Sequence, residues 1–269
     1  MSELPVVDQL AATWNAIADL CQGLQPEEWD LDTDCPGWTV RDQIAHLIGT
    51  ESVLLGRSAP APVPEAPHIK NPIGQMNEAW VETFRGRPGA EVAAVFGDVT
   101  ALRVDALRAM SAEEMDAETI GPVGPQPYRE FLQVRLMDCW VHEQDVRRAT
   151  GRPGQFEGSA AEAALSRLTG SLPFVVGKRC AAADGTSVVV RLRGPLARTM
   201  TVAVEGGRAR FVGGEPAAPA VTLTMSTETY ACLASGRWAA AEVLADGRAQ
   251  IEGDQSLGRA VLEQLDVIP

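Results

Sequence analysis

Three acids and one histidine stand close together in the stretch of residues 138–145, DCWVHEQD, and side chains of these types could bind a metal. Asp138 and His142 are four residues apart, so in a helix their side chains lean over the same turn. Zinc accepts carboxylate oxygen and imidazole nitrogen, so the pair could supply two ligands to one divalent ion. A catalytic zinc site typically has three protein ligands and an open fourth position, so a third ligand is needed.

The third ligand must come from elsewhere in the chain, which has only two further histidines. His46 lies in a stretch with helical spacing, whereas His68 lies among prolines. A helix holds a ligand more rigidly than a loop does, which favours His46. Spacing alone therefore allows a site made of His46, Asp138 and His142. It leaves two alternatives open: solvated ion pairs on a helix surface, and histidines satisfied within a core.

The helix that must carry Asp138 and His142 is predicted over residues 128–150, before the turn GRPG. Its apolar side holds Leu132, Leu136, Cys139 and Val146, which can pack against other helices, so the polar side could face solvent at little cost. We expect Cys139 to be a core thiol without a redox or ligand role. The polar stripe, at steps of four and three, consists of Phe131, Arg135, Asp138, His142, Asp145 and Ala149.

Apolar residues at helical spacing predict three earlier helical regions, over residues 5–23, 40–56 and 73–110. Thr39 can cap the second region, and the turn at residues 86–89 breaks the third. In the third region we expect core contacts from Val92, Val95, Phe96, Val99, Leu102, Val104 and Leu107. The prolines of residues 58–72 predict a long loop, in which His68 could belong to a lid or to a disordered connector.

Composition and periodicity change after residue 154. A helical pattern continues over residues 159–172, and alternation of β-branched residues then predicts strands. The strands are expected at residues 186–194, 197–206, 209–214, 219–226 and 249–253, with short helices around the last. We therefore expect an α+β protein. A helical domain at residues 1–154 would precede a smaller α+β domain with a mainly antiparallel sheet at residues 155–269.

The charge of the chain restricts the classes of partner. A formal net charge of −13 opposes general affinity for nucleic acid or anionic membranes, because both require clustered Lys and Arg. We expect small-molecule or protein partners. The five cysteines are scattered and include no CxxC pair, which indicates reduced thiols and not a disulfide framework. The chain has no basic leader and no apolar run of about 20 residues, so we expect a cytoplasmic protein.

Two stretches of the sequence resemble signatures of one family. Residues 29–47, WDLDTDCPGWTVRDQIAHL, and residues 135–153, RLMDCWVHEQDVRRATGRP, are similar to the signatures of the mycothiol-dependent maleylpyruvate isomerase family. The resemblance implies a DinB-like four-helix bundle whose metal ligands are His46, Asp138 and His142. A water or a substrate thiolate would take the fourth position. The family usually has Glu where this chain has Asp138, and Asp is shorter by one methylene.

The carboxyl-terminal region resembles a different kind of domain. Residues 221–238 and 249–265 are similar to sterol-carrier-like α+β domains, a form that this family carries at its carboxyl end. The resemblance implies a domain that helps to shape the substrate cleft. It offers Arg237 and Arg248 as candidate contacts for an anionic substrate group, against the alternative of ordinary surface arginines.

The resemblance implies a metal- and mycothiol-dependent thiol transferase or isomerase acting on a small electrophilic metabolite. Its cofactors would be a divalent metal, most simply zinc, and mycothiol, a thiol that implies an actinobacterial cell. Asp145 or Arg135 could orient a ligand or balance its charge, or form a plain salt bridge. Two other functions stay open: a non-catalytic small-molecule or lipid-binding protein, and a zinc-dependent hydrolase.

Overall fold

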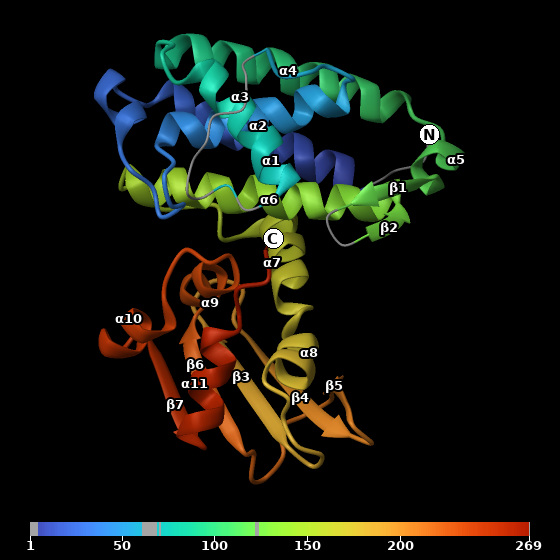
Figure 1. Cartoon of the computed structure of the whole chain (residues 1–269), viewed down its shortest axis with the longest axis vertical. Coiled ribbons are helices and arrows are strands. Elements are labelled where there is room, and N and C mark those ends of the chain that lie inside the picture. The colour runs from blue at the N-terminus through green and yellow to red at the C-terminus, as the bar shows by residue number, and fades with distance from the viewer. Residues whose placement is uncertain (1–4, 61–68, 70, 122–123, 269) are drawn as a thin grey trace. The chain divides into compact units, whose positions relative to one another are not determined.

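The computed structural model describes residues 5–60, 69, 71–121 and 124–268. Contacts within the chain divide it into two compact units, Met1–Gln155 and Phe156–Pro269. The first unit is helical, and the second combines helices with a sheet (Figure 1). The chain therefore has the α+β fold class that the sequence predicts.

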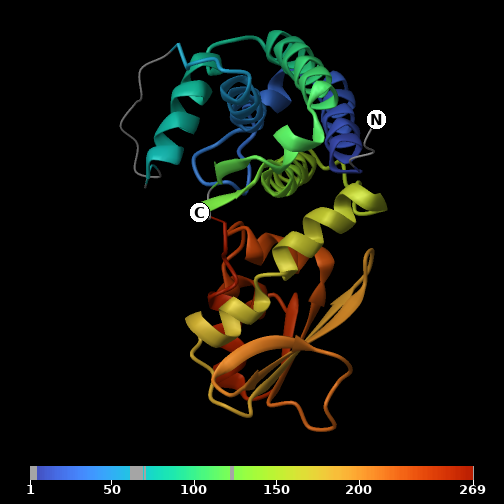
Figure 2. The same ribbon diagram turned by 90° about the vertical axis from the view of Figure 1, so that its right-hand side faces the viewer.

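Four long helices form the bundle of the first unit (Figure 2). α1 packs against α4 and α6, α2 packs against the same two helices, and α3 lies against α2. The elements of this unit are α1 (Pro5–Gln22), η1 (Pro26–Asp30), α2 (Val40–Leu54), α3 (Pro72–Phe84), α4 (Gly89–Ala109), α5 (Ala112–Asp116), β1 (Glu118–Gly121), β2 (Gly124–Pro127) and α6 (Tyr128–Ala149). The fully buried core side chains of the bundle include Trp14, Ile17, Ile44, Leu47, Phe96, Leu107, Leu132 and Trp140.

The start of α2 is fixed by its predicted cap, and α2 is the helix that carries His46. The Thr39 hydroxyl accepts a hydrogen bond from the Asp42 backbone N–H, and the Asp42 carboxylate accepts one from the Thr39 N–H at 3.1 Å. This reciprocal pair satisfies two backbone donors that a helix start would otherwise leave unpaired. The cap therefore sets the register of His46, one turn beyond Asp42.

Two details of the first unit differ from the sequence predictions. Residues 118–121 and 124–127, for which the sequence predicts no strand, form the hairpin β1–β2, in which Thr119 pairs with Gln126. Prolines are tolerated there because a two-stranded ribbon consists of edge strands. On α4, Leu102 is 47% exposed, whereas Arg103 is 3% exposed. The prediction that Leu102 faces the core was wrong, because Arg103 takes the inward position to meet a buried acid.

The second unit is built on one twisted sheet with the strand order β5-β4-β3-β6-β7. Neighbouring strands are antiparallel except β3 and β6, which are parallel. α9 and α11 pack against β6, and α8 packs against β5. The elements are α7 (Gly158–Thr169), α8 (Leu172–Phe174), η2 (Val175–Arg179), β3 (Ser187–Arg193), β4 (Arg198–Glu205), β5 (Arg208–Val212), β6 (Val221–Ser226), α9 (Thr227–Ala234), α10 (Ala240–Ala245), β7 (Ala249–Gly253) and α11 (Gln255–Glu263).

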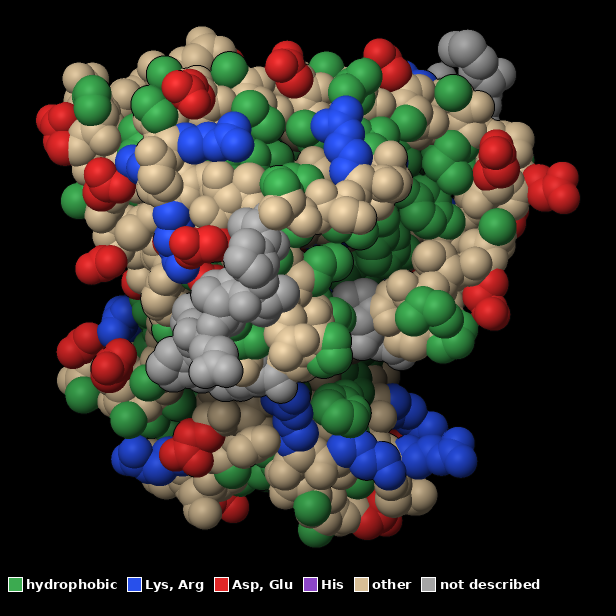
Figure 3. All heavy atoms as spheres, turned by 45° about the horizontal axis from the view of Figure 1, so that its top comes forward, with side chains coloured by type: hydrophobic (Ala, Val, Ile, Leu, Met, Phe, Trp, Pro, Cys, Tyr) green, Lys and Arg blue, Asp and Glu red, His purple; other side chains and the backbone are tan. Residues whose placement is uncertain are grey.

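Two further sequence predictions concern the loop and the membrane. His68, suggested for a lid or a connector, lies outside the described residues. None of the helices in the described part of the chain is both long and apolar enough to cross a bilayer. Acidic side chains are scattered over the face of the helical unit that Figure 3 shows, in keeping with the formal charge of −13.

Candidate metal centre

The three predicted ligands come together inside the helical bundle. His46 projects from α2, and Asp138 and His142 project from α6. One ligand atom from each of the three side chains can be chosen so that all lie within 4.8 Å of one another. The Nε2 atom of His46 lies 3.2 Å from Asp138 Oδ2, and the Nε2 atom of His142 lies 3.5 Å from Asp138 Oδ1. His46 and Asp138, which are 92 positions apart in the sequence, thus lie in one cluster.

The spacing of this cluster suits a zinc ion. In a tetrahedral site with bonds of about 2.0–2.1 Å, neighbouring ligand atoms lie about 3.3 Å apart. The Asp138 carboxylate comes near that value at both histidines, through Oδ2 at 3.2 Å from His46 Nε2 and through Oδ1 at 3.5 Å from His142 Nε2. Two imidazoles and one carboxylate are also a donor set that zinc accepts. The shorter aspartate therefore spans the distance to both histidines, and the residues present fit the metal.

Trp38 forms one wall of the cluster. Its ring centroid lies 5.1 Å from that of His46 and 5.9 Å from that of His142, while the two imidazole centroids are 4.6 Å apart. The indole N–H of Trp38 donates a 3.0 Å hydrogen bond to Glu78 on α3. Glu78 is fully buried and also binds Arg85 at 2.5 Å. The indole is thus held in place by the hydrogen bond of its N–H group, and its ring lies against both imidazoles.

His142 has a defined orientation because its second ring nitrogen is engaged. Its Nδ1 is hydrogen-bonded to Gln43 Oε1 and lies 3.6 Å from a carboxylate oxygen of Asp145. Asp145 is fully buried and binds Arg148 at 2.5 Å. An acceptor at Nδ1 favours the tautomer that leaves the Nε2 lone pair facing the cluster. Gln43 therefore leaves the Nε2 atom of His142 available as a ligand atom.

Asp138 is held from the other side by a buried chain of charged groups. Arg135 Nη1 donates to Asp138 Oδ2 at 2.5 Å, and its Nε and Nη2 donate to Glu51 Oε1 at 3.0 and 2.8 Å. Arg103 Nε on α4 donates to the other oxygen of Glu51 at 2.9 Å. Arg103 Nη2 also donates to the Tyr128 hydroxyl at 2.9 Å. Helices α2, α4 and α6 are thereby linked through one carboxylate.

The protonation states of the cluster suit a cation. Burial lowers the pKa of His46 to about 4, although the neighbouring Asp138 opposes the shift, so the imidazole is neutral at neutral pH. Burial alone would raise the pKa of Asp138, but the Arg135 guanidinium and the two imidazoles hold it well below its usual value. A neutral imidazole and an ionised carboxylate are the forms that bind metal.

The polar stripe of α6 is largely buried. The alternative of solvated ion pairs on a helix surface is therefore wrong. Arg135 is 5% exposed, His142 is 6% exposed and Asp145 is fully buried. The stripe is buried because its charges find partners on α2 and on neighbouring segments of the chain. Cys139 lies in the core as expected, where its sulfur accepts a hydrogen bond from the Trp14 indole at 3.3 Å. Burial raises the pKa of Cys139 to about 12.

The two arginines predicted as anion contacts lie in the second unit. Arg237 follows α9, and its Nη1 donates to the Ser235 carbonyl at 2.9 Å. Arg248 precedes β7, binds Asp246 at 2.8 Å and lies 4.2 Å from the Trp238 ring centroid. Both side chains are half-buried. Their contact with an anionic substrate stays a prediction.

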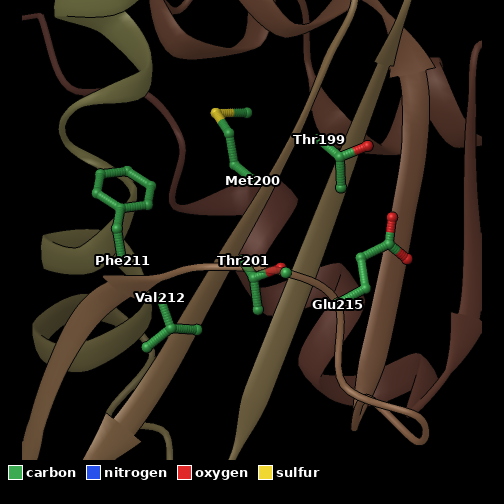
Figure 4. Close-up of a pocket in the computed structure, with 7 residues that line it drawn as sticks. Thr199, Met200, Thr201, Phe211, Val212 and Glu215 are labelled. Carbon is green, nitrogen blue, oxygen red and sulfur yellow. The ribbon is translucent and has the colours of Figure 1, made fainter.

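A cavity of about 360 Å³ opens on the second unit beside the start of β4 (Figure 4). Glu215 is the one ionisable residue of its described lining, and its carboxylate binds Arg191 at 2.6 Å. None of the residues predicted for the site lines this cavity. Its lining consists of Thr199, Met200, Thr201, Phe211, Val212, Gly214 and Glu215.

Sequence reasoning assigned no role to Trp38, Gln43, Glu51 or Arg103. For Glu51 and Arg103 the sequence did contain an indication, because an ionisable residue on the inner side of an apolar helix requires a buried partner. Gln43 lies three residues before His46, which places it on the same helix face. No pattern in the sequence indicates which acid on α2 meets which arginine on α4 or α6.

The fold and the site define a helical bundle with a candidate His–Asp–His metal centre, followed by an α+β unit. The model of the mycothiol maleylpyruvate isomerase N-terminal domain matches residues 10–147, and the chain belongs to that family. Residues 160–266 match the SCP-2 sterol transfer family. The first match contains all three candidate ligands, and the second contains Arg237 and Arg248.

Individual proteins that resemble this chain have low sequence identity to it. An uncharacterized protein of Mycobacterium tuberculosis is 29% identical over 223 residues, which cover 78% of this chain and 80% of the relative. The crystal structure of a mycothiol-dependent maleylpyruvate isomerase is 18% identical and superimposes with a TM-score of 0.57, covering 87% of this chain and 89% of that one. A mutant of such an isomerase gives a TM-score of 0.56 at 17% identity. These structures share the fold of this chain.

Proposed function

We propose that the protein is a metal- and mycothiol-dependent enzyme that acts on a small electrophilic metabolite, as an isomerase or as a thiol transferase. The observation that carries the proposal is the convergence of His46, Asp138 and His142 within 4.8 Å. Membership of the maleylpyruvate isomerase family and the likeness in fold to a mycothiol-dependent isomerase support the isomerase reading. In the proposal His46, Asp138 and His142 hold a divalent metal, most simply zinc.

Each part of the cluster has a task in this proposal. A bound metal would lower the pKa of a thiol and keep it as the nucleophilic thiolate at neutral pH. His46 and His142 offer neutral nitrogens, and Asp138 supplies the one negative charge among the ligands. Gln43 orients His142, and Trp38 shields both imidazoles from water. The chain thus binds and orients, and leaves the chemistry to the thiol.

Metal content tests the ligand set. After mild purification, mass spectrometry of the native protein or elemental analysis should find about one divalent metal per chain. His46→Ala should lose it, because only two protein ligands would remain. A matched control is Thr50→Ala, since Thr50 lies one turn further along α2 and its hydroxyl donates to the His46 backbone carbonyl, at 3.2 Å, and not to a ligand side chain of the described residues. Full metal content in His46→Ala would contradict the ligand set.

Substrate assays test the reaction class. The protein is incubated with mycothiol and either maleylpyruvate or a panel of electrophiles, and the products are separated and weighed by mass spectrometry. An isomerase gives a product of unchanged mass with the thiol recovered, whereas a transferase accumulates the S-conjugate. Conversion that proceeds equally without protein would contradict both readings. Hydrolysis without any thiol would instead favour the zinc-dependent hydrolase.

Arg237 and Arg248 are proposed to contact an anionic group of the substrate. Arg237→Gln and Arg248→Gln should then raise KM for anionic electrophiles more than for neutral ones, because only the charged substrate loses a charge-assisted hydrogen bond. Arg167→Gln, on α7, serves as a control. Equal changes for both kinds of substrate would reject the anion contact.

A second function is favoured by the match of residues 160–266 to the sterol transfer family. In this reading the second unit binds an apolar ligand and the bundle is not catalytic. Displacement of a fluorescent fatty acid by unlabelled lipids measures such binding. Tight, saturable lipid binding together with no metal in the purified protein would favour this carrier over the enzyme.

A further inference from the structure

Glu51 is a buried acid on the helix that carries His46, and the metal centre of the proposed function does not use it directly. Its side chain is 1% exposed, and both of its oxygens are occupied by guanidinium groups. Arg103 takes Oε2, and Arg135 takes Oε1 through two N–H donors. Burying an acid so completely removes its hydration, a loss that only close positive partners offset.

The contacts of Arg135 lead from Glu51 to the metal ligand. With Nε and Nη2 committed to Glu51, Arg135 presents Nη1 to Asp138 Oδ2 at 2.5 Å. A guanidinium is planar and rigid, so fixing one side of it fixes the direction of the other. Asp138 Oδ1 has no guanidinium partner among the described residues and lies 3.5 Å from the Nε2 atom of His142. Arg135 thus holds Oδ2, which also lies 3.2 Å from His46 Nε2, and leaves Oδ1 as the oxygen available to a metal.

We propose that Glu51 is a positioning residue of the metal centre, which acts through Arg135 to hold the Asp138 carboxylate in the orientation that binds the metal. The inference rests on the proposed function, since it presumes that the His–Asp–His cluster binds a metal. Aspartate has one fewer rotatable bond than glutamate, so its reach depends more strongly on how its carboxylate is turned. A fixed guanidinium beside it supplies that orientation.

The charges around Asp138 agree with this role. Glu51 and Asp138 carry two negative charges, and Arg103 and Arg135 carry two positive charges, so the buried group is neutral before a metal binds. Loss of Glu51 would leave the two buried guanidinium groups of Arg103 and Arg135 with the single carboxylate of Asp138, which contacts Arg135. That excess positive charge would also oppose a divalent cation at Asp138. A lost orientation of Asp138 and an excess of positive charge therefore both predict weaker metal binding when Glu51 is changed. A double variant distinguishes the two causes.

The first test compares zinc affinities of the full-length chain by competition with a chromophoric chelator. Glu51→Gln keeps the side-chain shape and should weaken zinc binding by about tenfold or more, the usual effect of losing a residue that orients a ligand. The double variant Glu51→Gln with Arg103→Gln removes one charge of each sign. It should weaken zinc binding to a similar degree if orientation is the cause, because Arg135 is unclamped without a change in net charge.

A matched control is Glu143→Gln on α6. Glu143 is as buried as Glu51, at 1% exposure, and its carboxylate pairs with Arg147 at 2.7 Å, with no ion pair to Arg135 or a candidate ligand among the described residues. The Glu143→Gln variant should have a lower free energy of unfolding and an unchanged zinc affinity. Helix content from circular dichroism verifies that each variant is folded. If Glu51→Gln does not fold, the double variant carries the test, since it leaves no uncompensated charge.

Cobalt provides a readout that a purely structural role would not alter. The visible absorption of cobalt bound in place of zinc depends on the directions of its ligands, so both Glu51 variants should change the spectrum and Glu143→Gln should not. Native affinity and spectrum in the folded double variant would overturn the inference while leaving the proposed function intact. A native chain that binds neither zinc nor cobalt would overturn both.

Discussion

Asp138 takes the position where the family usually carries glutamate, and its surroundings show how a shorter acid can serve. The separations of 3.2 and 3.5 Å to the two histidines need no movement of α6 toward α2. Arg135 fixes the carboxylate from behind, and the pKa of Asp138 stays well below its usual value. At the scale of single residues, the site therefore depends on partners that are not ligands.

Cys139 is predicted to be inert although it lies next to a candidate ligand in the chain. Burial raises its pKa to about 12, so at pH 8 only about one thiol in ten thousand is ionised. Iodoacetamide should therefore label the half-buried Cys35 and leave Cys139 unlabelled in the folded protein, as peptide mass spectrometry can measure. Raising the pH toward 12 increases the thiolate fraction and should speed labelling. Labelling of Cys139 at the rate of Cys35 at pH 8 would contradict this.

Tyr230 is predicted to destabilise the second unit through its hydroxyl. The side chain is fully buried, burial raises its pKa, and its oxygen has no hydrogen-bond partner among the described residues. Tyr230→Phe should raise the free energy of unfolding by about 1 kcal/mol, because a buried unpaired polar group is costly. Tyr128→Phe is the control, since it removes the acceptor for Arg103 and should be destabilising. Denaturant titration measures both variants.

At the scale of elements, α2 organises the site. It carries Gln43, His46 and Glu51 on its inner side, begins at the Thr39 cap and lies close to α3. The close packing of α2 and α3 depends on Gly49, because a Cβ added there would overlap the Trp80 side chain. The helix that supplies Gln43, His46 and Glu51 is therefore also fixed in position by a small residue.

Gly49→Ala should lower the free energy of unfolding by about 1–3 kcal/mol, the usual cost of overpacking a core. It should also weaken metal binding, because α2 must shift away from α3. Gly97→Ala on α4 is the matched control, since a Cβ there meets no atom within 4 Å and alanine favours a helix. Urea titration and chelator competition measure the two effects. Equal free energies of unfolding for the two variants would contradict the role of Gly49 in the packing of α2 against α3.

At the scale of the whole molecule, the chain consists of two compact units with different folds. The described contacts that define the candidate metal centre belong to Met1–Gln155, while the predicted anion contacts and the cavity beside β4 belong to Phe156–Pro269. In the proposed function, metal binding is thus assigned to the first unit, and substrate recognition draws on the second.

The fragment of residues 1–155 should therefore bind one zinc ion with the affinity of the full chain, while showing no conversion of the substrate. The reason is that each described partner of the three ligands lies within this fragment. Chelator competition on the purified fragment measures the affinity. A folded fragment with much weaker binding would mean that the second unit contributes to the metal centre.

The sequence by itself determined the periodic features of this protein. Apolar spacing gave the long helices, alternation gave the strands of the second unit, and the pair at residues 138 and 142 was visible because four residues make about one helical turn. The Thr39 cap was predictable for the same reason, since its chemistry is local. The hairpin β1–β2 was missed because its glycines and prolines carry no strand signal.

Only the tertiary structure decided which side of α6 is buried and which residues meet there. A helix with one apolar and one polar side is usually half-solvated, and the sequence allowed that arrangement. The polar side is buried instead because Glu51, Gln43 and Trp38 come from distant parts of the chain to pair with it. Such pairings depend on how helices pack, which spacing along one helix does not specify. The same packing brings His46 to Asp138 and turns a helical pattern into a candidate metal centre.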